Sequence, residues 1–189
     1  VWSLRLGYFL YSRIKKDKKD KRFTVIKTQF LWFLLTWTLG GMWTFITISA
    51  ALAAITSSNN LPLGLLEYFG LSLWIIGFTI EVIADSQKSI FRSKEENKNS
   101  FIKGGLWAWS RHPNYFGEII LWLGIALIAL PVLSDLQLIT LISPLFVFIL
   151  LTKISGIPLL ENRADKKWGE DPEYLKYKER TPVLILKKP

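Results

Sequence analysis

The sequence predicts an all-α fold, a polytopic transmembrane helix bundle with a short helical cytoplasmic cap. Hydrophobic residues make up 50% of the 189 residues, and the mean hydropathy of +0.27 is too high for an ordinary soluble domain of this size. Long apolar runs recur along the chain, and most basic residues lie between them. With no cysteine and one histidine, the chain has no disulfide framework and no basis for a zinc or haem centre, so we expect no metal site.

The first two membrane spans are expected early in the chain. Residues 1–12 have the pattern of the cytoplasmic end of a helix. Phe30–Thr56 contains no charged residue over 27 positions, which is long enough to cross a bilayer with some tilt. The segment SSNNLP predicts a turn. Leu65–Ile83 then crosses back and carries Glu67 and Glu81.

Two shorter apolar spans, Ile119–Ser134 and Leu136–Thr152, follow a polar stretch and are joined by a tight turn. Pro144 is expected to kink the second span, because proline removes a backbone donor inside a helix. After Pro158 the chain is polar again, and we expect two short cytoplasmic helices followed by an extended end. We interpret residues 1–189 as a single integral membrane domain whose N-terminal helices are missing from this sequence.

The distribution of the 24 basic residues predicts how the chain is oriented in the membrane. Eight lie in Arg13–Lys27, six in Lys88–Arg111 and nine in Lys153–Lys188, whereas the other two connections carry a single aspartate. Basic loops mark the cytoplasmic side of a membrane protein. We therefore expect the basic loops and the C-terminus to be cytoplasmic, in a bacterial inner membrane, and the partner of this charge to be the lipid bilayer and not nucleic acid.

The segment GLWAWSRHPNYFGE, Gly105–Glu118, places polar residues where the third apolar span begins. Pro113 fits the first position of a helix, with His112 near the N-cap. The unsatisfied N–H groups of a helix N-terminus favour anions, and Arg111 adds a full positive charge there. This segment is therefore the first candidate for a ligand-binding site, because polar groups at a membrane span are costly unless they bind something.

One turn deeper in the same helix, Asn114 and Glu118 share a face, and Tyr115 is three residues from Glu118. The segment can thus hold a phosphate at its mouth and form hydrogen bonds to a ligand further in. Trp107 and Trp109 fit a membrane–water interface. The alternative is purely structural: a capped helix start with an anchoring arginine, in which the histidine is only a cap.

A second candidate is a charged helix face. Its four residues are spaced by four, three and four positions, so a helix places them all on one side: Glu81, Asp85, Lys88 and Arg92. A carboxylate below the interface is expected to face the bundle interior. The face can therefore be the charged wall of a cytoplasm-facing pocket, or alternatively a salt-bridged exit from lipid.

A third candidate lies in the C-terminal region, which contains Glu161 and a tyrosine–arginine series. Tyr174, Tyr177 and Arg180 recur every three residues and can line one side of a short helix. Tyrosine and arginine together can hold an adenine and a phosphate, although an amphipathic tail on the inner leaflet has the same pattern. The sequence contains no G-x-G-x-x-G, P-loop or G-x-S-x-G pattern, so a Rossmann or kinase site is not expected.

Three segments together resemble a known superfamily. GGLWAWSRHPNYFGE, GIPLLENRADKKWG and YLKYKERTPVLIL look like the steroid 5-alpha-reductase C-terminal superfamily, in particular its branch of bacterial membrane proteins grouped as domain of unknown function 1295. The resemblance covers nearly the whole chain. The R-H-P-N-Y-x-G-E core also resembles sterol C14 and C7 reductases, and isoprenylcysteine carboxyl methyltransferases share R-H-P-x-Y. The asparagine after the proline favours the reductase branch.

The resemblance implies a reductase-like bundle of six to ten transmembrane helices. It would bind NADPH in a cytoplasm-facing cavity and pass its hydride to an electron-poor carbon–carbon double bond of a hydrophobic, steroid- or isoprenoid-like substrate in lipid metabolism. By motif position, Asn114, Tyr115 and Glu118 match residues around the nicotinamide and ribose. The full set of expected cofactor-binding residues is Glu81, Asp85, Lys88, Arg92, Arg111, His112, Asn114, Tyr115, Glu118, Glu161, Tyr174, Tyr177 and Arg180.

The sequence does not identify the catalytic proton donor. Steroid 5-alpha-reductases grip the substrate carbonyl through residues of their first helices, which are missing here, and the position matching their tyrosine falls near Trp2. Leu121 stands where those enzymes have a second buried glutamate. Two other functions stay open: an S-adenosylmethionine-dependent lipid or isoprenylcysteine-type methyltransferase, whose cofactor would not need Arg92 and Arg111, and a non-enzymatic lipid-binding membrane protein.

Overall fold

The structure is a computed structural model that describes residues 1–17, 26–59 and 61–188. It divides into two units, Val1–Phe45 and Ile46–Pro189, and each is described by itself. No β-strand occurs among the described residues, and the predicted all-α fold is confirmed.

The first unit is made of helices. Helix α1, Trp2–Asp17, includes the predicted helix end at residues 1–12 and continues beyond it. A single 3₁₀ turn, η2, covers Ile26–Thr28. Helix α2, Phe30–Ile55, matches the predicted first span to within one residue and runs from the first unit into the second. Its 26 residues are enough to cross the hydrocarbon core of a bilayer, and its lack of charged residues fits a lipid environment, where charges are costly.

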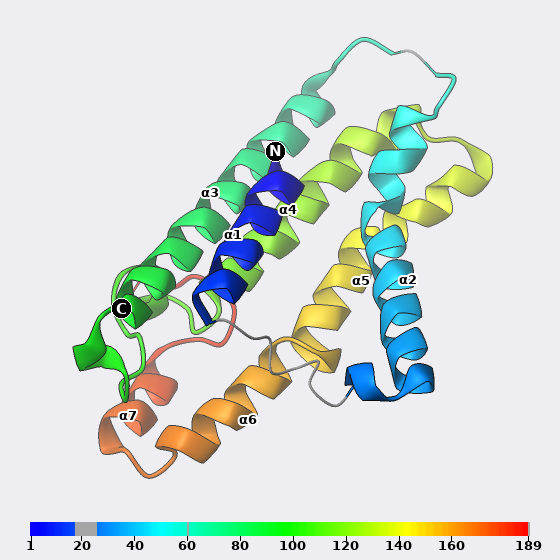
Figure 1. Ribbon diagram of the computed structural model, residues 1–189. Helices are drawn as coiled ribbons and strands as arrows, with labels where there is room; N and C mark the ends of the chain where they lie inside the picture. Colours follow the sequence, from blue (N-terminus) through cyan, green and yellow to red (C-terminus); the bar gives the residue numbers. More distant parts are fainter. Residues whose placement is uncertain (18–25, 60, 189) are drawn as a thin grey trace. The chain divides into compact units, whose positions relative to one another are not determined.

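The second unit is built on two antiparallel helices that lie side by side, α3, Leu65–Ser93, and α4, Pro113–Ala129 (Figure 1). Glycines let their backbones touch. A methyl group added to Gly77 would lie 2.5 Å from the Gly117 carbonyl oxygen, and one added to Gly124 would lie 2.5 Å from the Gly70 carbonyl oxygen. Close backbone approach through small residues is the usual basis of helix association in membranes. The contact also sets the register that brings the end of α3 beside the start of α4.

The boundaries of these two helices follow from local sequence. At the start of α3, the Glu67 carboxylate accepts a hydrogen bond from the Gly64 backbone N–H at 2.9 Å. At its other end α3 continues past the predicted apolar span and contains all four members of the charged helix face. Helix α4 begins at Pro113, as predicted, because the fixed φ of proline suits the first helical position and the missing N–H is not needed there.

The last span differs from the single kinked helix that the sequence predicts. After the short 3₁₀ helix η5, Leu130–Val132, the chain forms a longer 3₁₀ helix, η6, Asp135–Ile142. It continues as α5, Ser143–Ile149, and ends in one π turn, η7, Leu150–Ile154. Pro144 lies in the first turn of α5, directly after η6, so it marks the change from 3₁₀ to α geometry.

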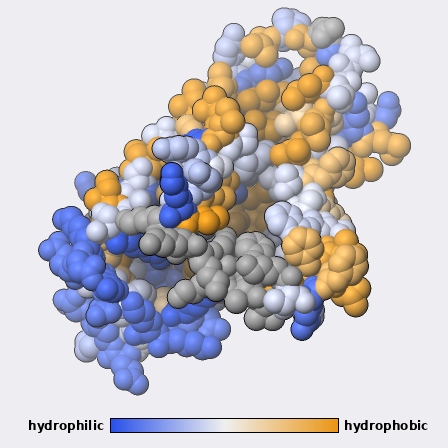
Figure 2. Space-filling model, in the orientation of Figure 1, coloured by the Kyte–Doolittle hydropathy of each residue, from blue (hydrophilic) through white to orange (hydrophobic). Residues whose placement is uncertain are grey.

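A polar cap follows, made of helix α6, Ile157–Trp168, helix α7, Pro172–Arg180, and an extended end. The two short helices and the extended end are confirmed. In the second unit, hydrophilic residues gather over α6 and α7, and hydrophobic residues cover much of α3 and α4 away from that end (Figure 2).

Among the described residues, four helical segments are long and apolar enough to cross a membrane: Phe30–Ile55, Leu65–Ser93, Pro113–Val132 and Asp135–Trp168. The protein is therefore an integral, multi-pass membrane protein. Three points stay predictions: the side of the protein that faces the cytoplasm, the identity of the host membrane, and the single-domain organisation.

Candidate functional site

The candidate site centres on the carboxylate of Glu161 on α6. One oxygen accepts a hydrogen bond from Arg111 Nη1 at 2.6 Å, and the other lies 2.8 Å from His112 Nε2. The side chains of Arg111, His112 and Glu161 are only 11%, 6% and 20% exposed. The structure thus joins two of the predicted sites, which are about fifty residues apart in sequence, into one buried cluster.

The chain approaches this cluster through a tight turn before α4. Gly105 has φ of +64°, a conformation that suits glycine, and an added methyl group would lie 2.5 Å from the Gln87 side chain. Gln87 Oε1 accepts a hydrogen bond from the Leu106 N–H at 3.0 Å. Trp107 then donates its indole N–H to the Ala84 carbonyl at 3.1 Å and is 3% exposed. The ring of Trp107 thus fixes the turn against α3, and its depth at the membrane interface stays a prediction.

The extended C-terminal segment holds the same turn from its other side. The Arg111 N–H donates to the Pro182 carbonyl at 2.9 Å, and the Lys187 N–H donates to the Trp109 carbonyl at 3.0 Å. Ser110, which is fully buried, donates its hydroxyl to the Leu184 carbonyl at 2.9 Å. The backbone around Arg111 and His112 is therefore held by partners on both sides.

His112 is the N-cap residue of α4, but its side chain makes no capping hydrogen bond. The ring turns instead to Glu161 and stacks on Tyr115, with 5.7 Å between ring centroids and 10° between planes. Its second nitrogen, Nδ1, and Arg111 Nε are both buried without a hydrogen-bond partner in the part of the chain that the structure describes. Buried polar atoms without partners are uncommon and call for a ligand or water.

Burial lowers the pKa of His112 below its ordinary value of 6.5, and the hydrogen bond to the Glu161 carboxylate opposes this only in part. The nearby charges of Lys88 and Arg111 lower it further. His112 is therefore neutral at neutral pH. Burial also raises the pKa of Tyr174 and of Tyr177, so both hydroxyls keep their protons and remain donors.

A second pair of contacts ties α6 to α7. The Tyr174 hydroxyl donates to the Asp165 carboxylate at 2.8 Å, and Lys178 Nζ binds the same carboxylate at 2.6 Å. Lys178 is also 3.9 Å from Glu161. Neither Asp165 nor Lys178 is in the expected cofactor-binding set, although Asp165 belongs to the same charged C-terminal segment as Glu161, which the sequence already marks as a candidate; Lys178 was not predicted. Their signal was present, since two acids one turn apart on α6 face a tyrosine and a lysine one turn apart on α7.

The charged face of α3 contributes its inner members to the site. Glu81 is 4% exposed, which confirms that it faces the protein interior. The Asn114 amide donates to Asp85 over a long 3.4 Å, so α3 and α4 meet through two predicted residues. Lys88 Nζ lies 4.3 Å from the centre of the Trp107 ring, a cation–π contact. Of the other predicted residues on these helices, Glu118 is half-buried and Arg92 is exposed.

The tyrosine–arginine series divides between two roles. Tyr177 donates its hydroxyl to the Trp107 carbonyl at 2.7 Å, which fastens α7 to the turn before α4. Arg180 is exposed and lines a cavity of about 250 Å³ together with Lys176 and Lys103. Of the predicted residues, Tyr177 and Arg180 line this cavity, and its two exposed cations, Lys176 and Arg180, are called the basic rim below.

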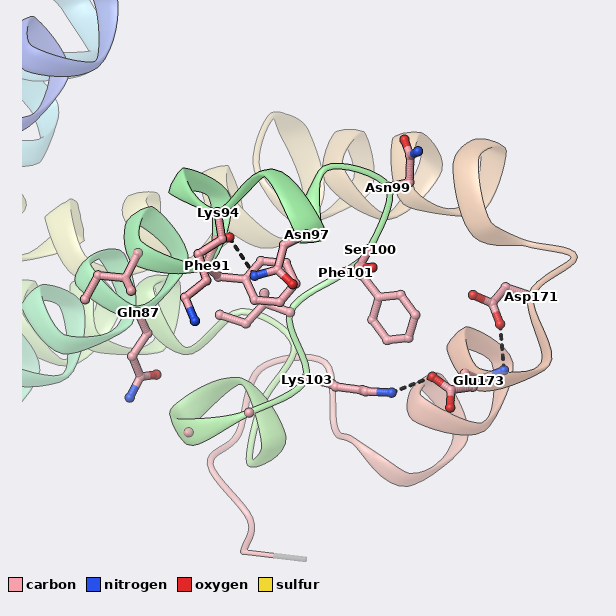
Figure 3. Close-up of a pocket in the computed structure, with 14 residues that line it drawn as sticks. Gln87, Phe91, Lys94, Asn97, Asn99, Ser100, Phe101, Lys103, Asp171 and Glu173 are labelled. Carbon is pink, nitrogen blue, oxygen red and sulfur yellow. Dashed lines mark hydrogen bonds and ion pairs between the residues drawn. The ribbon is translucent and has the colours of Figure 1, made fainter. Parts of the chain in front are cut away.

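A second, larger cavity is lined by none of Arg111, His112 and Glu161. Its volume is about 570 Å³, and it is enclosed by the end of α3, the following loop and the start of α7 (Figure 3). Phe101 and Lys103 reach from the loop toward α7, where Lys103 pairs with Glu173 at 2.5 Å. The edges of Phe101 and Tyr174 meet at a centroid distance of 5.3 Å. None of the thirteen predicted cofactor-binding residues lines this cavity.

The positive and negative charges within the cluster largely cancel. Arg111 and Lys178 face the carboxylates of Glu161 and Asp165, so the buried part is close to neutral. An anionic ligand would therefore be attracted by the basic rim, while the buried part offers fixed hydrogen-bonding groups. No group of three or more metal-ligating side chains occurs among the described residues.

Comparison with known proteins gives partial relatives. Mouse 3-oxo-5-alpha-steroid 4-dehydrogenase 1 is 34% identical over 58 residues, which cover 31% of this chain and 23% of that enzyme. The Bos taurus protein of the same name is 36% identical over 58 residues, with the same coverage. An uncharacterized Schizosaccharomyces pombe protein is 23% identical over 150 residues, 65% of this chain and 44% of that protein. The chain thus spans less than half the length of these relatives, and no solved structure matches it.

One family covers almost the whole chain. The profile of the family described as "Protein of unknown function (DUF1295)" matches residues 1–181, which include every residue of the predicted site. The partial similarity to steroid dehydrogenases agrees with a reductase-like family of membrane proteins. The chain therefore belongs to the DUF1295 family.

Proposed function

We propose that this protein is a membrane oxidoreductase that uses NADPH to reduce a carbon–carbon double bond of a hydrophobic substrate. The similarity to 3-oxo-5-alpha-steroid 4-dehydrogenases supports the reaction class. The observation that carries the proposal is the Glu161 cluster. Arg111, His112 and Lys178 gather around the Glu161 carboxylate, and two buried nitrogens there, Arg111 Nε and His112 Nδ1, lack partners within the described chain.

The available groups fit the parts of a reduced dinucleotide. Phosphates would be held at the basic rim, where Lys176 and Arg180 are exposed beside the 250 Å³ cavity. The unpaired atoms of Arg111 and His112 are suited to hydroxyl or carboxamide groups, because one is a donor and the other a ring nitrogen. Asn114, already in contact with Asp85, adds an amide deeper in the site. S-adenosylmethionine carries no phosphate, so it would leave the basic rim without a role.

The protein's own contribution would be positioning and the exclusion of water. The contacts from Glu161 to Arg111 and His112 hold the start of α4 rigidly, and the hydrogen bond from Tyr177 to the Trp107 carbonyl holds α7 over it. NADPH, when bound, supplies the hydride. Fixed geometry in a dry site lowers the barrier by removing the entropy of bringing donor and acceptor together.

The substrate we propose is an α,β-unsaturated carbonyl compound of steroid or isoprenoid type. Such a molecule partitions into lipid, and large apolar side chains such as Ile75, Ile76 and Leu123 are exposed on α3 and α4. A carbonyl conjugated to the double bond makes the distant carbon electron-poor, which is what hydride transfer requires. The substrate would thus approach from the bilayer and the cofactor from water.

The test is a ligand comparison on the purified chain in lipid nanodiscs. Thermal unfolding is followed at increasing concentrations of NADPH, NADH and S-adenosylmethionine. We expect NADPH to raise the unfolding temperature in a saturable manner, because a ligand that binds only the folded state stabilises it by mass action. NADH, which lacks the third phosphate, should stabilise less. Stabilisation by S-adenosylmethionine alone would instead support a methyltransferase.

Reduction itself is tested with NADPH deuterated at the transferable position and a steroid enone in the same nanodiscs. The proposal requires deuterium in the product, as measured by mass spectrometry. Lys176→Ala combined with Arg180→Ala should weaken NADPH more than NADH, and Arg163→Ala, which changes an exposed arginine on α6, serves as the matched control. Binding that is equal in both variants would remove the basic rim from the site.

A further inference from the structure

The contact between His112 and Glu161 determines which of the two imidazole nitrogens of His112 carries the proton. Glu161 receives Arg111 on one oxygen and His112 Nε2 on the other, at 2.6 and 2.8 Å. A carboxylate beside a guanidinium is ionised at neutral pH and can only accept hydrogen bonds. His112 Nε2 must then carry the proton and donate it.

The proton's place on Nε2 determines the character of the other ring nitrogen. In a neutral imidazole only one nitrogen bears a proton, so Nδ1 of His112 presents a lone pair. The ring is 94% buried, and stacking on Tyr115 restricts its rotation. Nδ1 has no hydrogen-bond partner among the described residues. Leaving a buried acceptor unsatisfied is unfavourable, so a donor from outside the described chain is called for.

We propose that His112 Nδ1 accepts a hydrogen bond from an O–H or N–H group of the cofactor. Glu161 is the positioning residue that keeps the His112 ring in the tautomer with an unprotonated Nδ1. The inference deepens the proposed function and rests on it for the identity of the ligand. Arg111 Nε, the second buried nitrogen without a partner, supplies a donor from the adjacent residue. A group that both donates and accepts, such as a ribose hydroxyl or the nicotinamide carboxamide, matches the two atoms together.

The surroundings of the ring as a whole favour the neutral form. Arg111 and Lys88 disfavour a second proton through their charge, and burial disfavours it more strongly, whereas Glu161 alone favours it. Lys88 comes from α3, Arg111 precedes α4, and Glu161 belongs to α6, so the ring is surrounded by groups from each packed element. His112 therefore acts as an acceptor and not as the proton donor of the reduction.

The chain offers an unusually direct test, because His112 is its only histidine. Protein labelled with ¹⁵N in histidine gives a single imidazole spectrum in nanodiscs, in which protonated and unprotonated ring nitrogens have well-separated shifts. We expect Nε2 to be protonated and Nδ1 unprotonated at neutral pH. Glu161→Gln, whose amide can either accept from Nε2 or donate to it, should produce a mixture of tautomers. A protonated Nδ1 in the unmodified chain would overturn the inference without any reference to NADPH.

The second arm adds ligand. Saturating NADPH should move the Nδ1 resonance in the direction of hydrogen bonding, and His112→Phe, which keeps a stacking ring without the acceptor, should bind NADPH about three- to tenfold more weakly. An NADPH analogue with acetyl in place of carboxamide distinguishes the two donors. If it moves Nδ1 less than NADPH does, the donor is the carboxamide, and if it moves Nδ1 equally, the donor is a ribose hydroxyl.

The outcomes separate the inference from the proposed function. If NADPH binds the unmodified chain but leaves Nδ1 unmoved, the acceptor role is wrong while the proposed cofactor stands. If NADPH does not bind at all, the proposed function is wrong, and the tautomer measured in the first arm still tests whether Glu161 fixes the ring. Arg163→Ala, on the exposed side of α6, should leave the imidazole spectrum unchanged.

Discussion

His112 Nε2 lies 2.8 Å from the Glu161 carboxylate, so a single contact ties the start of α4 to α6 across 49 residues of sequence. The same carboxylate binds Arg111 and lies 3.9 Å from Lys178. Glu161 thus connects the three segments that carry the family resemblance, and removing it should affect the polar cap and the site together.

Glu161→Ala should lower the unfolding free energy by about 1.5–3 kcal/mol, the range for hydrogen bonds to charged groups. Arg111 and His112, which are 11% and 6% exposed, would lose their common partner while still mostly buried. The measurement is reversible unfolding in mixed micelles. Glu170→Ala, at an exposed position just after α6, is the control. Equal effects of the two substitutions would show that the cluster does not stabilise the cap.

The stability of the protein should fall as the pH drops below about 6.5. The pKa of His112 is lowered from 6.5 in the folded state, so between that value and the folded pKa the unfolded chain binds more protons. Protonation of His112 therefore favours unfolding as the pH falls through this window. Above about pH 6.5 the histidine adds no pH dependence to the stability. Unfolding temperatures at pH 7.5 and 5.5 should differ less in His112→Phe than in the unmodified chain. An identical difference in both would contradict the assignment.

Gly77→Val should destabilise the α3–α4 pair by about 1–3 kcal/mol, the usual range for overpacking. An added methyl group would lie 2.5 Å from the Gly117 carbonyl oxygen, and backbone cannot yield as a side chain can. Gly104→Ala is the matched control, since a methyl group there meets no described atom within 4 Å. If both variants unfold at the same temperature, the two helices are not in backbone contact.

Tyr177→Phe should cost about 0.5–1.5 kcal/mol, because the Trp107 carbonyl would lose its 2.7 Å hydrogen bond. The raised pKa of Tyr177 adds a pH dependence: above pH 10 the unfolded chain loses its proton more readily, so stability should fall as the pH rises. Denaturation followed from pH 8 to 11 measures both effects. The phenylalanine variant should show a shallower alkaline decline, and an unchanged decline would exclude Tyr177 as its source.

Much of the fold could be predicted because its causes are local. Apolar runs of sufficient length define α2 and α3, and Pro113 marks the first turn of α4. The last span could not be predicted in detail. Its change from 3₁₀ to α to π geometry depends on packing and not on periodicity, and Pro144 alone does not distinguish a kink from a helix start. The glycine contacts were also missed, because their register depends on two helices at once.

The sequence predicted which residues belong to the candidate site, but not which of them contact one another. Spacing alone gathered the charged face of α3, and Glu81 is indeed buried. That Arg111 would pair with Glu161 does not follow from any local pattern, since the partners lie on elements 50 residues apart. The hydrogen bond from the Trp107 indole N–H to the Ala84 carbonyl on α3 likewise does not follow from any local pattern.

Calorimetry in nanodiscs measures whether NADPH binds at the Glu161 cluster, as we propose. The dissociation constant for NADPH is measured for the unmodified chain, for Arg111→Ala and for the control Arg163→Ala. We expect the Arg111 variant to bind about tenfold to 150-fold more weakly, the equivalent of one charged hydrogen bond, and the control to be unchanged. Equal affinity of all three proteins, or no NADPH binding by the unmodified chain, would contradict the claim.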